Sequence, residues 1–329
     1  MIEIIQPGPI ATVQDTGRVG HRNIGVGTAG AMDRRALDIG NILTGNTPDA
    51  AAIEFTLGGF AVRFLEDQVI ALTGADANAR LDGKPLPSWW VRHVRAGQEL
   101  RAGPSTDGMR SYLCVSGGID VPAVLGSRAT DLKGAFGGHE GRMLRAGDRL
   151  TVLDKPQNTL PEGGFGLSAA RLGFMDPPGE LPVIRFVPAA EWADLSPEDQ
   201  IKVQAQSWKL RPDSNRMGYR FEGQPVVFET HRELLSHGIL PGTIQLPPDG
   251  LPAIQMNDAN TCGGYPKLGV VIDADMPRLA QIRLGTEVRF EAVDRETALA
   301  VQKEHTKLLS VLPLKIRLAS DYAQRWGMQ

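Results

Sequence analysis

The chain has 329 residues, of which 42% are hydrophobic and 22% charged, and its formal net charge is −3. This length allows two domains of ordinary size, and the small net charge without a basic stripe argues against a nucleic-acid partner. No apolar run approaches the roughly 18 residues of a bilayer-spanning helix, so we expect no membrane association. The start MIEIIQPGP lacks a signal-peptide pattern, and two cysteines make no disulfide framework, so we expect a cytoplasmic protein.

The first part of the chain is expected to form short strands joined by turns. A strand at 2–5 is followed by a long glycine-rich loop at 11–33, which has few large apolar side chains. Asp33 is a favourable N-cap residue, and the apolar spacing after it predicts a helix at 34–44 that ends at Gly45. Further strands are expected at 61–64, 69–73, 109–115 and 149–153.

The second part of the chain is also expected to form short strands, and a linker separates it from the first part. Residues 156–182 lose periodicity and gain proline and glycine, which indicates a linker between domains at 1–155 and 183–329. Ser196-Pro197 starts a predicted helix at about 197–206, and another helix is expected from near Asp294. Strands are expected at 183–187, 225–229, 242–246, 252–256, 269–272 and 287–292. We therefore predict a mainly β chain with a few helices.

Several common sites are excluded because their motifs are absent. Gly83-Lys84 is followed by proline, so it forms no P-loop, and no glycine fingerprint for a dinucleotide follows a strand. The six histidines show no zinc spacing with one another or with the cysteines, so we expect no metal. Cys262 could be a nucleophile or a bystander thiol, and no histidine lies near it in the sequence.

Arginine and carboxylate chemistry remains. The arginine fork suits carboxylate or phosphoryl oxygens, although a structural ion pair is the more common role of each such residue. The sharpest candidate is Arg216, in a loop before a strand, and Asp258 and Asp273 could act as bases. Asp275 precedes a proline-started helix, which favours an N-cap. The stretch 252–290 that holds these aspartates is either one wall of a site or a surface loop fixed by its own polar side chains.

An ordered series of motifs carries a resemblance to a known family. The motifs are Thr12-Val13-Gln14-Asp15-Thr16-Gly17-Arg18, Gly30-Ala31-Met32-Asp33, Gly45-Asn46, YLCVSGGID at 112–120, Leu125-Gly126-Ser127-Arg128, Arg216-Met217-Gly218, Gly242-Thr243-Ile244-Gln245 and Gly263-Gly264-Tyr265-Pro266. With them the chain, from about residue 5 to 292, resembles the allophanate hydrolase subunit 2 family. This family includes the C subunit of bacterial 5-oxoprolinase and the second half of the carboxyltransferase domain of urea carboxylase. One departure is Cys262, where relatives are expected to have threonine.

The resemblance implies two cyclophilin-like β-barrel domains in tandem and a substrate cleft completed by an allophanate hydrolase subunit 1 type partner. One branch uses ATP, bound by this chain or by a partner, to open the lactam of 5-oxoproline to glutamate, together with a lactam-utilisation subunit. A second branch moves a carboxyl group from carboxybiotin on another chain to urea. A third sequesters the inhibitor of a kinase and is not catalytic. A separate chain of this size resembles the 5-oxoprolinase arrangement most, with a small amide as substrate.

Combining the residues with the resemblance gives two predicted sets. The predicted catalytic residues are Arg216, Asp258, Tyr265 and Asp273. The predicted substrate-binding residues are Asp15, Arg18, Asp33, Arg128, Gln245, Gly263 and Gly264.

Overall fold

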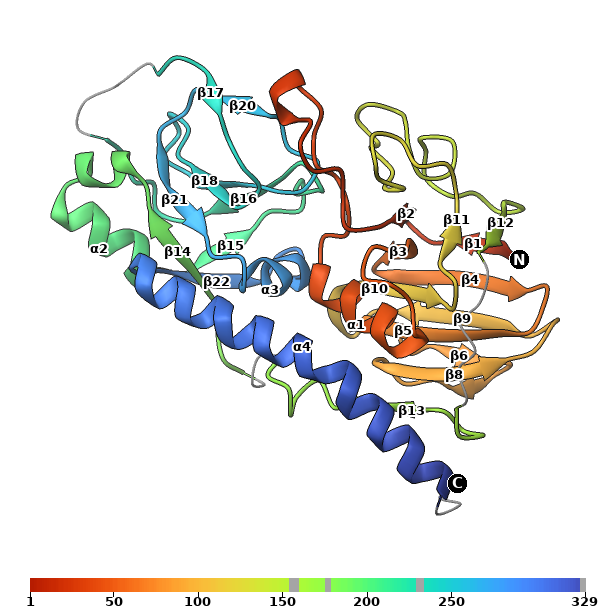
Figure 1. Ribbon diagram of the computed structural model, residues 1–329. Helices are drawn as coiled ribbons and strands as arrows, with labels where there is room; N and C mark the ends of the chain where they lie inside the picture. The colour runs from red at the N-terminus through yellow and green to blue at the C-terminus, as the bar shows by residue number, and fades with distance from the viewer. Residues whose placement is uncertain (154–159, 175–178, 229–233, 326–329) are drawn as a thin grey trace. The chain divides into compact units, whose positions relative to one another are not determined.

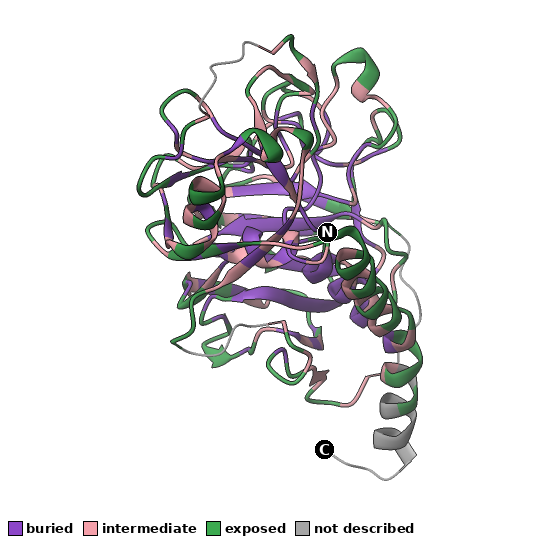
Figure 2. Ribbon diagram, turned by 90° about the vertical axis from the view of Figure 1, so that its left-hand side faces the viewer, coloured by how far each residue is buried: buried purple, intermediate pink, exposed green. Residues whose placement is uncertain are grey.

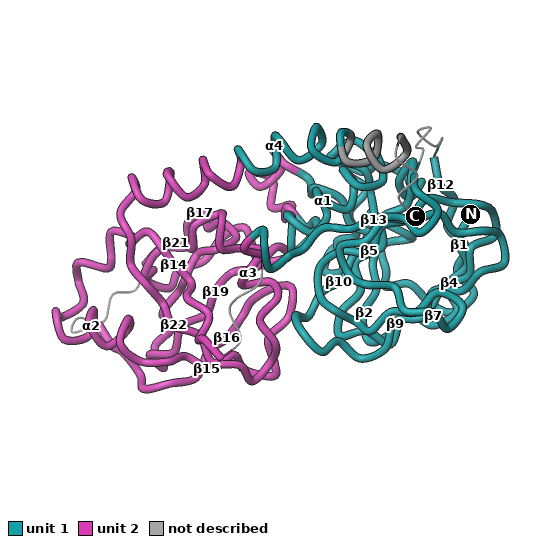
Figure 3. Tube along the Cα trace, turned by 90° about the horizontal axis from the view of Figure 1, so that it is seen from below, with its two compact units in different colours: residues 1–18, 29–172, 307–329 teal, residues 19–28, 173–306 magenta. Residues whose placement is uncertain are grey.

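The computed structural model describes residues 1–153, 160–174, 179–228 and 234–325, and Figure 1 labels its elements. The chain forms two compact units, as coloured in Figure 3. Unit 1 contains residues 1–18, 29–172 and 307–329, and unit 2 contains residues 19–28 and 173–306. The last helix, α4 (Arg295–Arg325), has residues in both units.

Unit 1 is built from two antiparallel sheets. The seven-stranded sheet has the spatial order β11 (Ile119–Asp120), β12 (Arg149–Val152), β1 (Ile2–Pro7), β4 (Gly58–Phe64), β9 (Glu99–Pro104), β6 (Arg80–Leu81), β7 (Lys84–Pro85). The six-stranded sheet has the order β13 (Phe165–Gly166), β8 (Trp90–Val94), β5 (Gln68–Asp76), β10 (Asp107–Val115), β3 (Ala52–Thr56), β2 (Ile10–Gln14).

The buried side chains on one face of each strand show where the core of unit 1 lies. In β4 the buried residues Phe60, Val62 and Phe64 belong to one apolar cluster, which also takes Phe55 of β3 and Leu72 of β5 from the other sheet. Because successive side chains of a strand point to opposite faces, this cluster must fill the space between the sheets. Figure 2 shows the buried residues concentrated in the strands.

Helix α1 (Arg34–Thr44) covers the second face of β5 and confirms the predicted helix. Asp33 accepts a hydrogen bond from the Ala36 amide at 2.9 Å, and Gly45 ends the helix at a φ of 74°. Thr73 of β5 donates its hydroxyl to the Ala36 carbonyl at 2.7 Å. Strand β5 is therefore buried on both faces, which explains its nearly continuous apolar sequence.

The predicted loop at 11–33 is wrong in its first part. Residues Ile10–Gln14 form β2, which pairs with β3, and Ala11 to Gln14 are all buried. Two hydrogen bonds tie this strand to a distant segment: the Gln14 side-chain nitrogen donates to the Thr130 carbonyl at 3.2 Å, and the Thr130 hydroxyl donates to the Val13 carbonyl at 2.9 Å. Further along the segment, a short 3-10 helix, η1 (Arg22–Ile24), lies in unit 2.

Unit 2 is a closed seven-stranded barrel. Its strands, in spatial order, are β14 (Val183–Pro188), β21 (Lys267–Val271), β18 (Thr243–Gln245), β19 (Ala253–Gln255), β16 (Gly218–Glu222), β15 (Trp208–Leu210) and β22 (Glu287–Ala292). The parallel pair β14–β22 closes the ring. Trp208, Phe221 and Phe290 fill it, with the Phe290 ring 6.0 Å from Trp208 and 5.2 Å from Phe221. The prediction of a mainly β chain with a few helices is confirmed.

Short elements surround the barrel. They are η2 (Ala190–Asp194), α2 (Pro197–Ala205), α3 (Met276–Gln281) and the two-stranded sheet β17 (His237–Gly238) with β20 (Cys262–Gly263). Helix α2 confirms the prediction, with the Ser196 hydroxyl accepting from the Asp199 amide at 3.0 Å. The strand predicted at 225–229 is wrong over 225–228, which form no strand, and residue 229 lies outside the described residues.

Candidate functional site

In unit 1, Asp15 connects two loops. Its carboxylate accepts hydrogen bonds from the Gly17 amide at 2.8 Å, from the Ser127 hydroxyl at 2.6 Å and from the Arg128 amide. The Arg128 side chain instead donates to the Val121 carbonyl at 3.0 Å. Asp15 and Arg128, two of the predicted substrate-binding residues, therefore meet through the backbone of Arg128 and not through its guanidinium.

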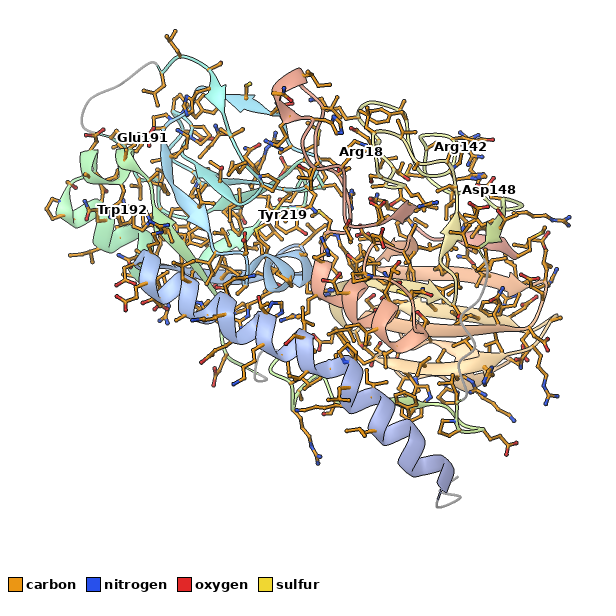
Figure 4. The ribbon with its side chains drawn as sticks, viewed as in Figure 1. Arg18, Arg142, Asp148, Glu191, Trp192 and Tyr219 are labelled. Carbon is orange, nitrogen blue, oxygen red and sulfur yellow. The ribbon has the colours of Figure 1, made fainter. Side chains whose placement is uncertain are left out.

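Arg18 is fully enclosed in the same region. It donates to the carbonyl oxygens of Val124 at 3.2 Å and Ala129 at 2.6 Å, and its guanidinium lies 4.6 Å from the centroid of the Phe136 ring. Such contacts fix the segment 124–137 around the arginine. Figure 4 labels Arg18.

Asp33 belongs to a separate buried network. Its backbone amide donates to the Tyr112 hydroxyl at 2.8 Å, and that hydroxyl donates to Glu54 at 2.7 Å. Glu54 also accepts from the Met32 amide at 2.9 Å. Burial, and then the charges of Glu54 and Asp33, raise the pKa of Tyr112 well above its ordinary value, so Tyr112 stays a neutral donor.

A cavity of about 460 Å³ lies beside this region of unit 1. The glycine-rich segment from Phe136 to Gly141 lines one side, and Asp120, Val124, Arg149 and Leu150 are among the residues that line the rest. Neither Asp15 nor Asp33 lines it, and Arg18 contacts it only through Phe136 and Val124.

An ion pair supports the glycine-rich segment. Arg142 donates to both carboxylate oxygens of Asp148, at 2.8 and 3.0 Å, and the two side chains lie together in Figure 4. The hydrogen bonds from Arg142 lower the pKa of Asp148, although burial opposes the shift. His139 contributes Nε2 at 3.5 Å from Asp148. These charges position the loop and are engaged with one another.

In unit 2, Arg216 and Asp258 form a bidentate ion pair. Nε and Nη2 of Arg216 donate to the two oxygens of Asp258 at 2.8 and 2.9 Å, and the Asp258 amide donates to the Arg216 carbonyl at 2.9 Å. The two side chains are only 7% and 3% exposed. The sequence thus selected two residues that do lie together, and their geometry joins the loop before β16 to the segment after β19.

The other predicted catalytic residues differ from this ion pair in their accessibility. Tyr265 is 49% exposed, and Asp273 is exposed just beyond β21. Asp275 is the N-cap residue of α3, as predicted, but its side chain makes no capping bond: the carboxylate accepts from Arg185, at 2.6 Å for Nη2 and 2.9 Å for Nε. The carboxylate therefore pairs with an arginine 90 positions away and not with the backbone amides of its own helix.

Gln245 and Gly263 are close together in unit 2. A Cβ atom added to Gly263 would come within 2.5 Å of the Gln245 side-chain nitrogen, so the glycine is needed for this approach. Gln255 donates to the Gln245 oxygen at 2.8 Å and orients the amide. At Gly264 an added Cβ would meet the Leu234 carbonyl at 2.9 Å.

Sequence reasoning missed two polar residues near Gly263. His237 is paired with Gly263 across β17–β20, and no local motif surrounds it that could have revealed it. Arg22 donates to the Ile239 carbonyl, and burial lowers its pKa while the nearby Cys262 raises it. Only long-range pairing brings either residue here.

Two absences concern bound groups. Within the described residues, no three or more His, Cys, Asp or Glu side chains are grouped to hold a metal ion. The glycine-rich loop also does not suit a phosphate, because the amides of Gly134, Gly138 and Gly141 donate to acceptors of the chain itself. We therefore assign no ATP-binding residues to this chain. In the described part of the chain, no helix is long and apolar enough to cross a membrane.

Comparison with known proteins decides the family. Residues 24–292 match the family described as carboxyltransferase domain, subdomain A and B. The chain belongs to this family. It is 42% identical over 316 residues to the C subunit of the 5-oxoprolinase of Escherichia coli, covering 96% of this chain and 99% of that protein. It is 41% identical to the corresponding 5-oxoprolinase protein of Haemophilus influenzae, with 93% and 95% covered.

The fold of the chain is also similar to part of a solved enzyme structure. The urea amidolyase of K. lactis matches with a TM-score of 0.84 and 28% identity, over 94% of this chain. The match covers only 20% of that protein. The chain therefore corresponds to one part of the larger enzyme, and to almost the whole of the bacterial subunits.

Proposed function

We propose that this chain is a subunit of an ATP-dependent 5-oxoprolinase. The observation that carries the proposal is the end-to-end match to subunits of that name, with 96% and 99% of the two chains covered for the Escherichia coli protein. We expect the enzyme to work in the cytoplasm with an allophanate hydrolase subunit 1 type protein and a lactam-utilisation subunit.

The proposed reaction opens the ring of 5-oxoproline. The oxygen of a water molecule adds to the lactam carbon, the C–N bond breaks, and the ring nitrogen takes a proton to become the amine of glutamate. A second water molecule hydrolyses ATP to ADP and phosphate, which drives the opening of a stable amide. The contribution of this chain is to bind and orient the amide, since orientation alone can supply a large part of a rate enhancement.

The predicted site residues fall into two groups: buried residues that are already bonded within the chain, and exposed residues that are accessible to a substrate or a partner. Asp15, Arg18 and Asp33 of unit 1, like Arg216 and Asp258 of unit 2, are buried in bonds to the chain itself. We propose that they position the loops of a site. Among the predicted catalytic residues, Tyr265 and Asp273 are exposed and could contact a substrate or a partner.

Carboxyl transfer is the second candidate, favoured by the family description and by the similarity to urea amidolyase. In that case carboxybiotin would be a substrate carried by another chain, and the acceptor would be urea or a related amide. Both candidates require this chain to recognise an amide, so the choice between them depends on the partners.

The test is reconstitution. The chain is combined with its subunit 1 type partner and the lactam-utilisation subunit, and glutamate release from 5-oxoproline is followed with and without ATP. ATP-dependent release supports the proposal. No release, together with urea-dependent ADP formation when a biotin carboxylase is added, would replace it with carboxyl transfer.

A further inference from the structure

Two buried polar atoms that are not engaged lie at the β17–β20 pair. Gln245 is 5% exposed, and its side-chain nitrogen has no hydrogen-bond partner in the described part of the chain. The same holds for Nε2 of His237, also among the described residues. Buried polar groups are nearly always paired, so two open positions near one glycine require an explanation.

The two side chains lie on the same face of the strand pair. His237 stands directly opposite Gly263, and the side chains of opposite residues project to the same face, with Cβ atoms about 4.5–5.5 Å apart. The Gln245 nitrogen lies 2.5 Å from the Cβ position of Gly263, hence on that face. The Ile239 side chain, two residues after His237, approaches the same position to 3.1 Å, as the alternation of a strand requires.

The hydrogen-bond roles of the two atoms are opposite. The amide nitrogen of Gln245 can only donate, and its oxygen is held by Gln255. Nδ1 of His237 lies 2.8 Å from the Leu235 carbonyl, which can only accept, so the proton of the neutral ring is on Nδ1. Nε2 is then a hydrogen-bond acceptor. The face presents one donor and one acceptor beside the Ile239 side chain.

We propose that Gln245 and His237 together recognise an amide whose C=O and N–H lie on the same side of the C–N bond. The carbonyl oxygen accepts from Gln245, and the N–H donates to His237. A lactam, a primary amide and urea have this arrangement, whereas an ordinary trans amide directs the two groups to opposite sides. This ligand choice rests on the proposed function, in which the substrate is a lactam, and it makes His237 a specificity-determining residue.

The strand pair is exposed although the two recognising atoms are buried. Leu235, Gly238 and Cys262 are exposed, so the strand pair lies at the surface, while the two recognising atoms are shielded from water. A hydrogen bond formed there faces no competition from solvent, and neither protein group has to give up a partner.

Binding can be tested on the full chain without any turnover. The protein is labelled with ¹⁵N at histidine and glutamine side chains, the signals are assigned with His237→Asn and Gln245→Glu, and 2-pyrrolidinone is added. We expect saturable shifts of His237 Nε2 and of the Gln245 amide. N-methyl-2-pyrrolidinone, which lacks the N–H, should bind about tenfold more weakly, as expected for one lost hydrogen bond.

The variants separate recognition from folding. His237→Asn keeps a donor for the Leu235 carbonyl but has no acceptor at the position of Nε2, so it should bind the two lactams equally. Equal binding of both lactams by the wild-type chain, or shifts that never saturate, would overturn the proposal. A second titration with urea distinguishes the sources: tighter binding of urea than of 2-pyrrolidinone assigns the pair to urea-type amides and contradicts the lactam assignment. These outcomes do not depend on glutamate release, so failure of the proposed function is recognised separately.

Discussion

The ion pair between Arg216 and Asp258 allows a sharp separation of structure from catalysis. Replacing Arg216 with alanine leaves a carboxylate that is only 3% exposed without its bidentate donor. Removing one partner of such a pair costs about 3–5 kcal/mol, because the remaining charge stays buried and poorly compensated. A loss of about 4 kcal/mol lowers the ratio of folded to unfolded protein by about a thousandfold.

Urea unfolding measures this loss. With an m-value of about 1–3 kcal/mol per molar urea, the midpoint should fall by about 1–4 M. Because the chain has two units, circular dichroism is combined with amide hydrogen exchange, which should assign the loss to unit 2. The matched control is Arg220→Ala: its pair with Asp213 is 62% and 42% exposed, so the change should stay below about 1 kcal/mol.

A double variant tests whether the stability loss comes from the unpaired buried charge. Arg216→Met combined with Asp258→Leu removes both charges and fills the space with apolar atoms, which should recover most of the stability. If Arg216→Ala unfolds like the wild type while the reconstituted enzyme loses ring opening, the guanidinium acts on the substrate and the structural role assigned above is wrong.

Three further predictions concern stability. Asp15→Ala leaves the donors of Gly17, Ser127 and Arg128 without their acceptor and should lower the urea unfolding free energy by about 2–3 kcal/mol, whereas Asp15→Asn should lose less. Gly30→Ala should destabilise strongly, since its Cβ would lie 2.7 Å from the Gly17 nitrogen, while Gly20→Ala, also at positive φ but with open space around it, should cost only about 1 kcal/mol. Burial raises the pKa of the Cys114 thiol, so only the unfolded chain loses this proton as the pH rises past about 8.5; stability should fall above that pH, and Cys114→Ala should reduce the slope of unfolding free energy against pH.

Local signals predicted the elements whose causes are local. Helix α1 was predicted because its cap, apolar spacing and terminal glycine all lie within a short stretch of sequence, and each acts as expected. Strand β2 was missed because its polar residues indicated a loop, whereas buried Gln14 donates to a carbonyl that lies 116 positions away. The same distance effect explains Asp275, whose capping role is displaced by Arg185. Sequence patterns do not report such long-range competition.

The candidate site shows the same division. Gly263 was selected from a motif, and its close approach to Gln245 gives a physical reason for a glycine there. His237 could not be found this way, because only the pairing of β17 with β20 brings it to Gly263. Arg216 and Asp258 were selected as reactive charges, but each turns out to be the main partner of the other.

The hydrogen bonds that the predicted arginines already make within the chain affect how a substrate carboxylate would be bound. Arg18 donates to main-chain carbonyls, Arg128 to the Val121 carbonyl and Arg216 to Asp258, so the predicted arginines are engaged within the chain. The two buried polar atoms beside Gly263 that have no partner among the described residues, on Gln245 and His237, suit the amide edge. We therefore expect the isolated chain to bind 2-pyrrolidinone and 5-oxoproline with affinities within about threefold, because the carboxylate adds no favourable contact. With the subunit 1 type partner present, 5-oxoproline should gain at least about tenfold over 2-pyrrolidinone, since one charge-assisted hydrogen bond contributes about 1.5–3 kcal/mol. A strong preference for 5-oxoproline by the isolated chain, measured by calorimetry, would contradict this and place a carboxylate-binding arginine within the chain itself.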